Sequence, residues 1–315
     1  MRRHLNVSIQ SCLLYFLVTL TFQAVAQQQN VPSKPQSDVI LGVLEDHAGI
    51  YSGDPYFRVV RAVFQKHGNE WRSFPNDCTN TQCLKSLTKS YPRKVSWTIA
   101  FDGKDLGRME ARTPEDFRLY ALVGMEEITT PEPVPTVGKR AREYGGFTDD
   151  PVYRPLAAVS QPNFKDPESW RPSRLSQEQL NAVRKEIRDK LPRASNCRDP
   201  HENKLKSKQP IVKEIKVVST YSSKEGWSLV QLGLRGYYCD GIADDSGLFI
   251  GQWYLIEPSG KMRFLGSGMS LVDAGDYDGD GKSEVLFAVD GYDLGGYRLF
   301  YRDFSRSAEF LFSYH

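Results

Sequence analysis

Hydrophobic and polar residues alternate along much of the chain from residue 39 onward, and a period of two is typical of strands that bury one face. In KVSWTIAF, every second residue from Val95 to Phe101 is large and apolar, and the DGKDLG that follows predicts a hairpin turn. YFRVVRAVF followed by HGN, and FRLYALVG at 117–124, have the same form. We therefore predict an N-terminal β-rich region over residues 39–175, in which the proline-rich stretch 130–174 forms long loops with short strands.

Strand patterns are densest between residues 211 and 315. They come in succession, separated by Gly, Asp and Ser turns: VKEIKVVSTY, WSLVQLGL, LFIGQWYLI, EVLFAV, YRLFYR and AEFLFSY. Short strands at this spacing predict an antiparallel meander. The fold class is thus mainly β, as a β-propeller-like structure or a sandwich, with a second, C-terminal β-rich region at 211–315.

One segment breaks the period of two. SQEQLNAVRKEIRDKLP opens with Ser176 as a candidate N-cap and has Gln179 three residues later, the pattern of a capping box. Its apolar residues fall on one helical face, namely Leu180, Val183, Ile187 and Leu191. We predict one amphipathic helix near 176–191, ended before Pro192, whose apolar stripe packs on the protein itself. CRDPHENKLKSKQP then predicts a charged loop, which completes the segment 176–210.

The amino terminus carries Arg2 and Arg3, then the apolar run CLLYFLVTLTF and the small residues of AVA, which are the parts of a secretory signal peptide. An uncleaved anchor would need about 20 apolar residues, and the run is shorter. We predict that residues 1–26 are removed after Ala26 and that QQQNVPSKPQSD, residues 27–38, forms a flexible lead-in. The mature protein is then expected in the periplasm or outside the cell, with no membrane-spanning segment.

Charge argues against a nucleic-acid partner. The chain has 41 basic and 39 acidic residues. Removing the signal peptide takes away Arg2 and Arg3 and no acidic residue, so 41 minus 2 leaves 39 basic residues against 39 acidic ones. A balanced surface without a basic block produces no field that draws in nucleic acid or anionic lipid.

Cysteine usage agrees with export. Without Cys12 of the signal peptide, the mature chain has Cys78, Cys83, Cys197 and Cys239. An even number in an oxidising compartment predicts two disulfides. Cys78 and Cys83 bracket the polar loop NDCTNTQC and would close it, leaving Cys197 for Cys239, although the two other pairings stay open. A metal site is less favoured because no CxxC and no suitably spaced histidine is present.

The strongest candidate for chemistry is the acidic run DYDGDGKSE. Asp276, Asp278 and Asp280 alternate, Gly281 follows, and Glu284 comes four residues after the last aspartate. Four carboxylates this close repel one another unless a cation lies between them, and calcium accepts six to eight hard oxygen ligands. A solvated acidic turn is the alternative, but it needs neither the alternation nor the glycine. We predict a structural Ca²⁺ site.

The run begins like an EF-hand loop and then departs from it. The bidentate glutamate that an EF-hand has at its twelfth position would fall at Phe287, and EVLFAV is a strand pattern rather than a helix. The acidic run is therefore expected to join two strands.

In this form DAGDYDGDGKSEVLF resembles the calcium motif of FG-GAP and VCBS-type repeats, in which a DxDxDGxxD/E loop precedes a strand of a β-propeller-like blade. The likeness covers one repeat, from Val272 to about Tyr301. It implies calcium ligands at Asp276, Asp278, Asp280 and Glu284, with the backbone carbonyl of Lys282 as a further ligand.

A catalytic site is not evident. The chain has no HExxH, no GxSxG elbow and no phosphate-binding glycine loop. Acidic pairs such as Glu45 with Asp46, or Asp244 with Asp245, have the chemistry for glycoside hydrolysis, but their separation in space decides that role.

Three tyrosines near DGYDLGGY, namely Tyr292, Tyr297 and Tyr301, have the chemistry of a sugar-stacking surface, although packing within strands is the more ordinary role. We therefore expect a non-enzymatic protein that binds an envelope protein or glycan. A secreted polysaccharide hydrolase and a structural envelope module are the alternatives.

Overall fold

The computed structural model describes residues 39–47, 57–76, 80–112, 124–127, 154–190, 212–236, 251–291 and 294–313, and the short strands at 193–194, 197–198, 205–206, 209–210 and 238–239. All of them belong to the compact unit Asp38–His315. The expected signal peptide and lead-in lie outside the described residues. Among the helices that are described, none has the length and apolar character needed to cross a membrane.

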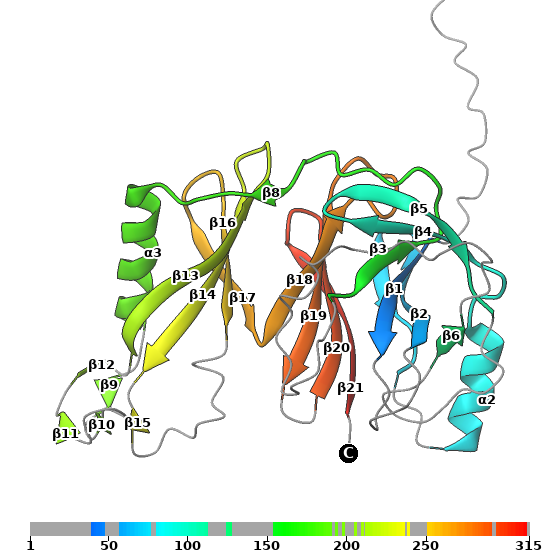
Figure 1. Cartoon of the computed structure of the whole chain (residues 1–315), viewed down its shortest axis with the longest axis horizontal. Helices are drawn as coiled ribbons and strands as arrows, with labels where there is room; N and C mark the ends of the chain where they lie inside the picture. The colour runs from blue at the N-terminus through cyan, green and yellow to red at the C-terminus, as the bar shows by residue number, and fades with distance from the viewer. Residues whose placement is uncertain are drawn as a thin grey trace, which may run out of the picture. The chain divides into compact units, whose positions relative to one another are not determined.

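The largest sheet is antiparallel and seven-stranded (Figure 1). Its strands are β1 (Ile40–His47), β2 (Phe57–His67), β3 (Glu70–Ser73), β4 (Ser96–Phe101), β5 (Lys104–Glu110), β6 (Met125–Glu127) and β7 (Leu156–Val159). The order is β3-β2-β1-β7-β4-β5, with β6 paired to β2. β7 comes out of the proline-rich stretch and completes this sheet by pairing with both β1 and β4.

Two further antiparallel sheets come from the C-terminal half. One is a four-stranded meander of β18 (Met269–Gly275), β19 (Glu284–Gly291), β20 (Leu294–Tyr301) and β21 (Arg306–Ser313). The other contains β8 (Arg171–Pro172), β13 (Val212–Ser222), β14 (Ser228–Gly236), β16 (Gln252–Ile256) and β17 (Met262–Ser267). Its order is β17-β16-β14-β13-β8. The predicted C-terminal strands are thus confirmed where the structure describes them, with residues 248–250 of LFIGQWYLI outside the described part, and the mainly β, antiparallel class is confirmed.

Short strands lie between α3 (Gln177–Lys190) and β16. They are β9 (Arg193–Ala194), β10 (Cys197–Arg198), β11 (Leu205–Lys206), β12 (Gln209–Pro210) and β15 (Tyr238–Cys239). β11, β10 and β15 form one small sheet, and β12 pairs with β9. Residues 197–210 were expected to form only a charged loop, so the short strands β10, β11 and β12 correct that prediction.

The four-stranded sheet is buried on both faces. Along β19, Leu286 and Ala288 join a core shared with the seven-stranded sheet, whereas Val285 and Phe287 join a core shared with the five-stranded sheet. Successive side chains of a strand point to opposite faces, so each face of the sheet meets a different neighbour. This double burial explains why EVLFAV is apolar without interruption.

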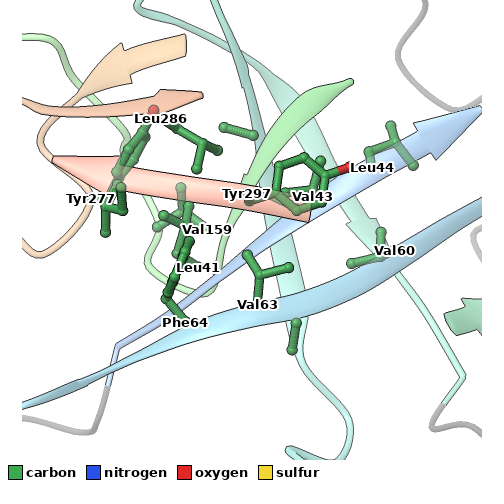
Figure 2. Packing of buried hydrophobic residues seen from close by; sticks show 14 of the residues in the cluster. Leu41, Val43, Leu44, Val60, Val63, Phe64, Val159, Tyr277, Leu286 and Tyr297 are labelled. Carbon is green, nitrogen blue, oxygen red and sulfur yellow. The ribbon is translucent and has the colours of Figure 1, made fainter. Parts of the chain in front are cut away.

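Figure 2 shows the first of these cores. Leu41 of β1 and Phe64 of β2 lie in one packed group with Leu286 of β19 and Tyr297 of β20. The group joins the first strands of the described chain to the last ones. Both β-rich regions therefore contribute to a common core.

Local patterns account for several turns. The predicted hairpin after KVSWTIAF is present, with Asp102 and Gly103 joining β4 to β5 at φ values of 51° and 69°. Two successive positive φ values characterise the turn type that matches strand twist in two-residue hairpins. The expected alternation fails at Thr98, which is fully buried because its hydroxyl donates to the Gln161 carbonyl oxygen at 2.7 Å.

Both described helices begin with side-chain caps. The predicted capping box of α3 is confirmed, because the Gln179 N–H donates to Ser176 Oγ at 3.1 Å and the Ser176 N–H donates to Gln179 Oε1 at 2.9 Å. A second helix, α2 (Thr81–Ser90), stands where a polar loop was expected. It forms because Asn80 caps it by accepting the Cys83 N–H at 3.0 Å.

The cysteines are described only in part. Cys83 lies on α2 and is disulfide-bonded. Its expected partner Cys78 lies outside the described residues, so that pairing stays a prediction. Cys197 of β10 and Cys239 of β15 are direct partners in the antiparallel register. Backbones in such a register have the Cα spacing that a disulfide spans, which supports the second predicted pairing without testing it.

The double burial of the four-stranded sheet predicts a large difference between two phenylalanines. Phe287 is fully buried and lies 5.0 Å from the Trp253 ring. Phe287→Ala should lower the free energy of unfolding by about 3 to 5 kcal/mol because it leaves a cavity. Phe264→Ala is the control, since Phe264 is 53% exposed and its loss should cost less than about 1 kcal/mol. Denaturant titration measures both, and equal losses would contradict double burial.

Candidate metal centre

The acidic run forms the turn between β18 and β19, as the strand-linking prediction required. β18 ends at Gly275, where a side chain would collide with the Phe164 ring. The turn then uses positive φ at Gly279 (77°) and Gly281 (87°), a conformation that glycine adopts without strain. Glu284 is the first residue of β19, so the loop closes at the start of a buried strand.

The loop folds around the Asp276 carboxylate. That carboxylate accepts the backbone N–H groups of Gly279 at 2.6 Å, Asp280 at 3.0 Å and Gly281 at 2.9 Å. Asp280 in turn accepts the N–H of Lys282 at 2.8 Å. The alternation of aspartates and glycines thus organises the turn through side-chain to backbone hydrogen bonds.

Three of the predicted ligands come together. Asp276, Asp278 and Glu284 each offer a carboxylate oxygen, and these oxygens lie within 4.8 Å of one another. Asp278 and Glu284 are both only 2% exposed. The carboxylate of Asp280, by contrast, is at the exposed side of the loop and is not part of the group. We call Asp276, Asp278 and Glu284 the acidic triad.

Burial and mutual repulsion disfavour the charged forms of the triad. The pKa of Glu284 is raised well above its ordinary value, chiefly by burial and then by the charge of Asp278. The pKa of Asp276 is raised by burial, with Asp278 and Asp280 adding to the effect against hydrogen bonds from Gly281 and Gly279. A cation at the triad would offset both effects.

The donor set fits a hard cation. The triad offers carboxylate oxygens, and the Tyr277 N–H already fixes one oxygen of Glu284 at 2.8 Å. Oxygen-only ligands suit calcium or magnesium rather than metals that prefer sulfur or nitrogen. The triad is the single group of this kind among the residues that the structure describes.

A lysine from another sheet reaches the triad. Lys66 of β2 forms an ion pair with Asp278, and its side chain is 13% exposed. Its ammonium group lies 5.3 Å from the centre of the Trp71 ring and 5.9 Å from that of Tyr301. Nothing in the local sequence around Lys66 indicates this role, because the contact joins residues 212 positions apart.

Residues 161–170 form a strap across the acidic loop. The Asp276 N–H donates to the Lys165 carbonyl at 2.8 Å, and Ser283 Oγ donates to the Asp166 carboxylate at 2.7 Å. Glu168 accepts the indole N–H of Trp170 at 3.1 Å. The strap falls in the proline-rich stretch, whose sequence predicted loops but not this contact.

A buried aspartate lies just before the loop. Asp273 is 1% exposed, and its Oδ1 accepts the Gly103 N–H of the β4–β5 turn at 3.0 Å. Its Oδ2 has no hydrogen-bond partner within the described part of the chain. Burial raises the pKa of Asp273 to about 7, against the hydrogen bond from Gly103 and the charge of Arg154.

The tyrosines and acids considered for sugar binding or hydrolysis have structural contacts instead. Tyr297 and Tyr301 are buried, which corrects the stacking alternative for both, and Tyr292 lies outside the described residues. Tyr297 Oη donates to Glu45 at 2.8 Å, and Arg61 pairs with the same carboxylate at 2.8 Å. Both of these partners of the Glu45 carboxylate therefore lie in the core between two sheets, which gives this carboxylate a structural role. The side chain of Asp46, and both Asp244 and Asp245, lie outside the described residues.

Comparison with known proteins adds no relative: no family model, no curated protein and no solved structure matches the chain.

Asp273 makes a prediction about pH. A raised carboxyl pKa means that the fold favours the protonated form, so its stabilising contribution is complete below pH 3.8 and is lost as the pH rises to about 7. Asp273→Asn should therefore gain stability relative to the native protein across that window, by at most about 4 kcal/mol. Denaturant titrations of both proteins from acid to alkaline pH measure this difference in the free energy of unfolding. The triad is the same in both proteins, so its contribution cancels.

The control for this experiment is Ser270→Ala, because Ser270 lies on the same strand as Asp273 and has no titratable group. Its stability difference from the native protein should be independent of pH. A flat difference for Asp273→Asn as well would show that folding does not raise the pKa of Asp273.

Proposed function

We propose that this is an exported, β-rich protein whose acidic loop holds a structural calcium ion. The observation that carries the proposal is the acidic triad, in which three carboxylate oxygens lie within 4.8 Å of one another in a largely buried turn. The likeness of DYDGDGKSE to FG-GAP and VCBS-type loops supports calcium over other hard cations. Export is supported by the signal-peptide pattern of residues 1–26 and by the cysteine count.

In this proposal Asp276, Asp278 and Glu284 hold the ion. Asp280 and the carbonyl of Lys282, the two other positions of the motif, would add oxygens toward the six to eight that calcium takes. Bound calcium would supply two positive charges against the three carboxylates of the triad. The loop itself positions the ligands, since its backbone N–H groups already orient the Asp276 carboxylate.

A structural role follows from where the ligands are attached. Asp276 follows β18 and Glu284 begins β19, and both strands lie in the sheet that contributes to two cores. The strap also bonds the loop at Asp276 and Ser283. An ion held here would fix the ends of buried strands against the strap. Extracellular calcium modules bind with dissociation constants of roughly 10⁻⁴ to 10⁻³ M, which suits permanent occupancy outside the cell.

Calcium should stabilise the mature protein. Ligand that binds only the native state adds about 2.7 kcal/mol at a hundredfold excess over its dissociation constant, or roughly 5 to 10 °C in melting temperature for a domain of this size. Calorimetry or a dye-based melt in about 10 mM calcium and in excess chelator compares the two states.

Glu284→Gln should abolish that calcium response, because it removes a charge from a buried ligand. Glu257→Gln is the matched control, since Glu257 lies in the turn between β16 and β17, away from the triad. The same melting temperature with and without calcium in the native protein, together with no heat of binding, would rule out the site.

The wider role that we propose is binding of an envelope protein or glycan. It rests on the expected export and on the structural nature of the metal ligands. The polysaccharide hydrolase alternative is weakened at Glu45, whose carboxylate is paired with Arg61 and Tyr297. A structural envelope module remains the other alternative.

Pull-down tests the binding role. Disulfide-intact mature protein, immobilised in calcium, should retain a specific envelope protein or glycan, and Glu284→Gln should retain less of it at a temperature where the loop is loosened. If neither protein retains anything beyond the bare matrix, binding is contradicted and a structural module is favoured.

A further inference from the structure

We infer that Lys66 is an internal counter-ion that competes with calcium for Asp278 and so sets the calcium affinity of the acidic loop. This inference rests on the proposed calcium site. It deepens that proposal because it names a residue, far from the motif, that regulates the same loop.

The contact is built into the fold rather than made by a loose surface chain. Lys66 lies near the end of β2, and its side chain is 13% exposed, against 3% for Asp278. Ion pairs this well shielded from water interact more strongly than exposed ones. The ammonium group of Lys66 therefore lies beside Asp278, which the motif predicts as a calcium ligand.

Aromatic rings hold the ammonium group of Lys66 near the triad. Trp71 of β3 and Tyr301 of β20 lie within 6 Å of it, with centroid distances of 5.3 Å and 5.9 Å. Tyr301 is itself fixed, because its hydroxyl donates to Glu70 at 2.7 Å. The ring faces attract the cation without neutralising it, so its charge still acts on Asp278.

A second carboxylate offers Lys66 an alternative position. Tyr301, whose ring centre lies 5.9 Å from the Lys66 ammonium group, donates its hydroxyl to Glu70 at 2.7 Å, so the Glu70 carboxylate lies on the same side of Lys66 as Tyr301. Glu70 is partly exposed and also pairs with Arg302 at 3.6 Å. When calcium occupies the triad, Lys66 is repelled from Asp278 and can turn toward Glu70.

Electrostatics give the sign of the effect. Lys66 lowers the energy of the loop before calcium binds, and it repels the divalent ion afterwards. Both effects weaken calcium binding. Removing the charge should therefore tighten binding, whereas a residue that merely holds the loop in shape would weaken binding when removed.

Calorimetric titration with calcium alone tests this difference. Lys66→Met keeps the apolar stem and removes the charge, and its calcium dissociation constant should be about tenfold lower than that of the native protein. Lys66→Arg keeps the charge and should stay close to the native value. Lys216→Met is the matched control, because Lys216 is exposed on β13, in a different sheet.

A measurement on the native protein removes any dependence on how the variants fold. Reaction of lysine amines with an acylating reagent, read out by peptide mass spectrometry, should modify Lys66 faster in calcium than in chelator because calcium releases it from Asp278. Lys216 should react at the same rate in both. If the protein binds calcium but Lys66 reacts at the same rate in calcium and in chelator, the inference is wrong.

The two proposals fail in different ways. Absence of calcium binding by the native protein and by Lys66→Met contradicts the calcium site and the inference with it. Binding by the native protein with equal or weaker binding by Lys66→Met contradicts only the role of Lys66. Binding by Lys66→Met alone would contradict a bound calcium ion in the native protein and would support only the role of Lys66, because the lysine would then block the site.

Discussion

The carboxylates of Asp276, Asp278 and Glu284 lie close together in a poorly solvated turn, and positive charge has to balance them for the turn to keep its shape. Burial raises the pKa values of Asp276 and Glu284, and each neighbouring acid adds to the effect. Backbone N–H groups donate hydrogen bonds to Asp276 and Glu284, and Lys66 forms an ion pair with Asp278. Calcium would take the place of Lys66 beside Asp278 and supply two positive charges.

The same turn also organises the sheets. β18 and β19 belong to a sheet that packs on both faces, so the turn between them is anchored by two cores at once. The strap at residues 161–170 and Lys66 of β2 attach the turn to the N-terminal half of the chain. The turn is thereby joined to the seven-stranded sheet through Lys66 of β2.

The sequence was sufficient where structure depends on near neighbours. The period of two located β2 and β4, Ser176 and Gln179 located the start of α3, and the spacing of the acidic run located the turn between two strands. Each of these signals is local, because the interacting groups lie within a few residues of one another.

Contacts between distant segments could not be predicted in this way. Lys66 meets Asp278 across 212 positions, and Asp273 meets Gly103 across 170. No local pattern specifies such partners. α2 was missed for a different reason: its first turn lies within NDCTNTQC, which was interpreted as a polar loop between two cysteines, and the Asn80 cap was not recognised. The pairing of Cys197 opposite Cys239 depends on the register of two short strands, which spacing alone left open.

Anomalous diffraction at long wavelength from crystals of the mature protein grown in calcium tests the central claim most directly. We expect one peak between the carboxylates of Asp276, Asp278 and Glu284, with oxygen ligands at about 2.3 to 2.6 Å. A loop without a peak, with Lys66 still paired to Asp278, would show that the lysine alone balances the triad and would contradict the calcium site.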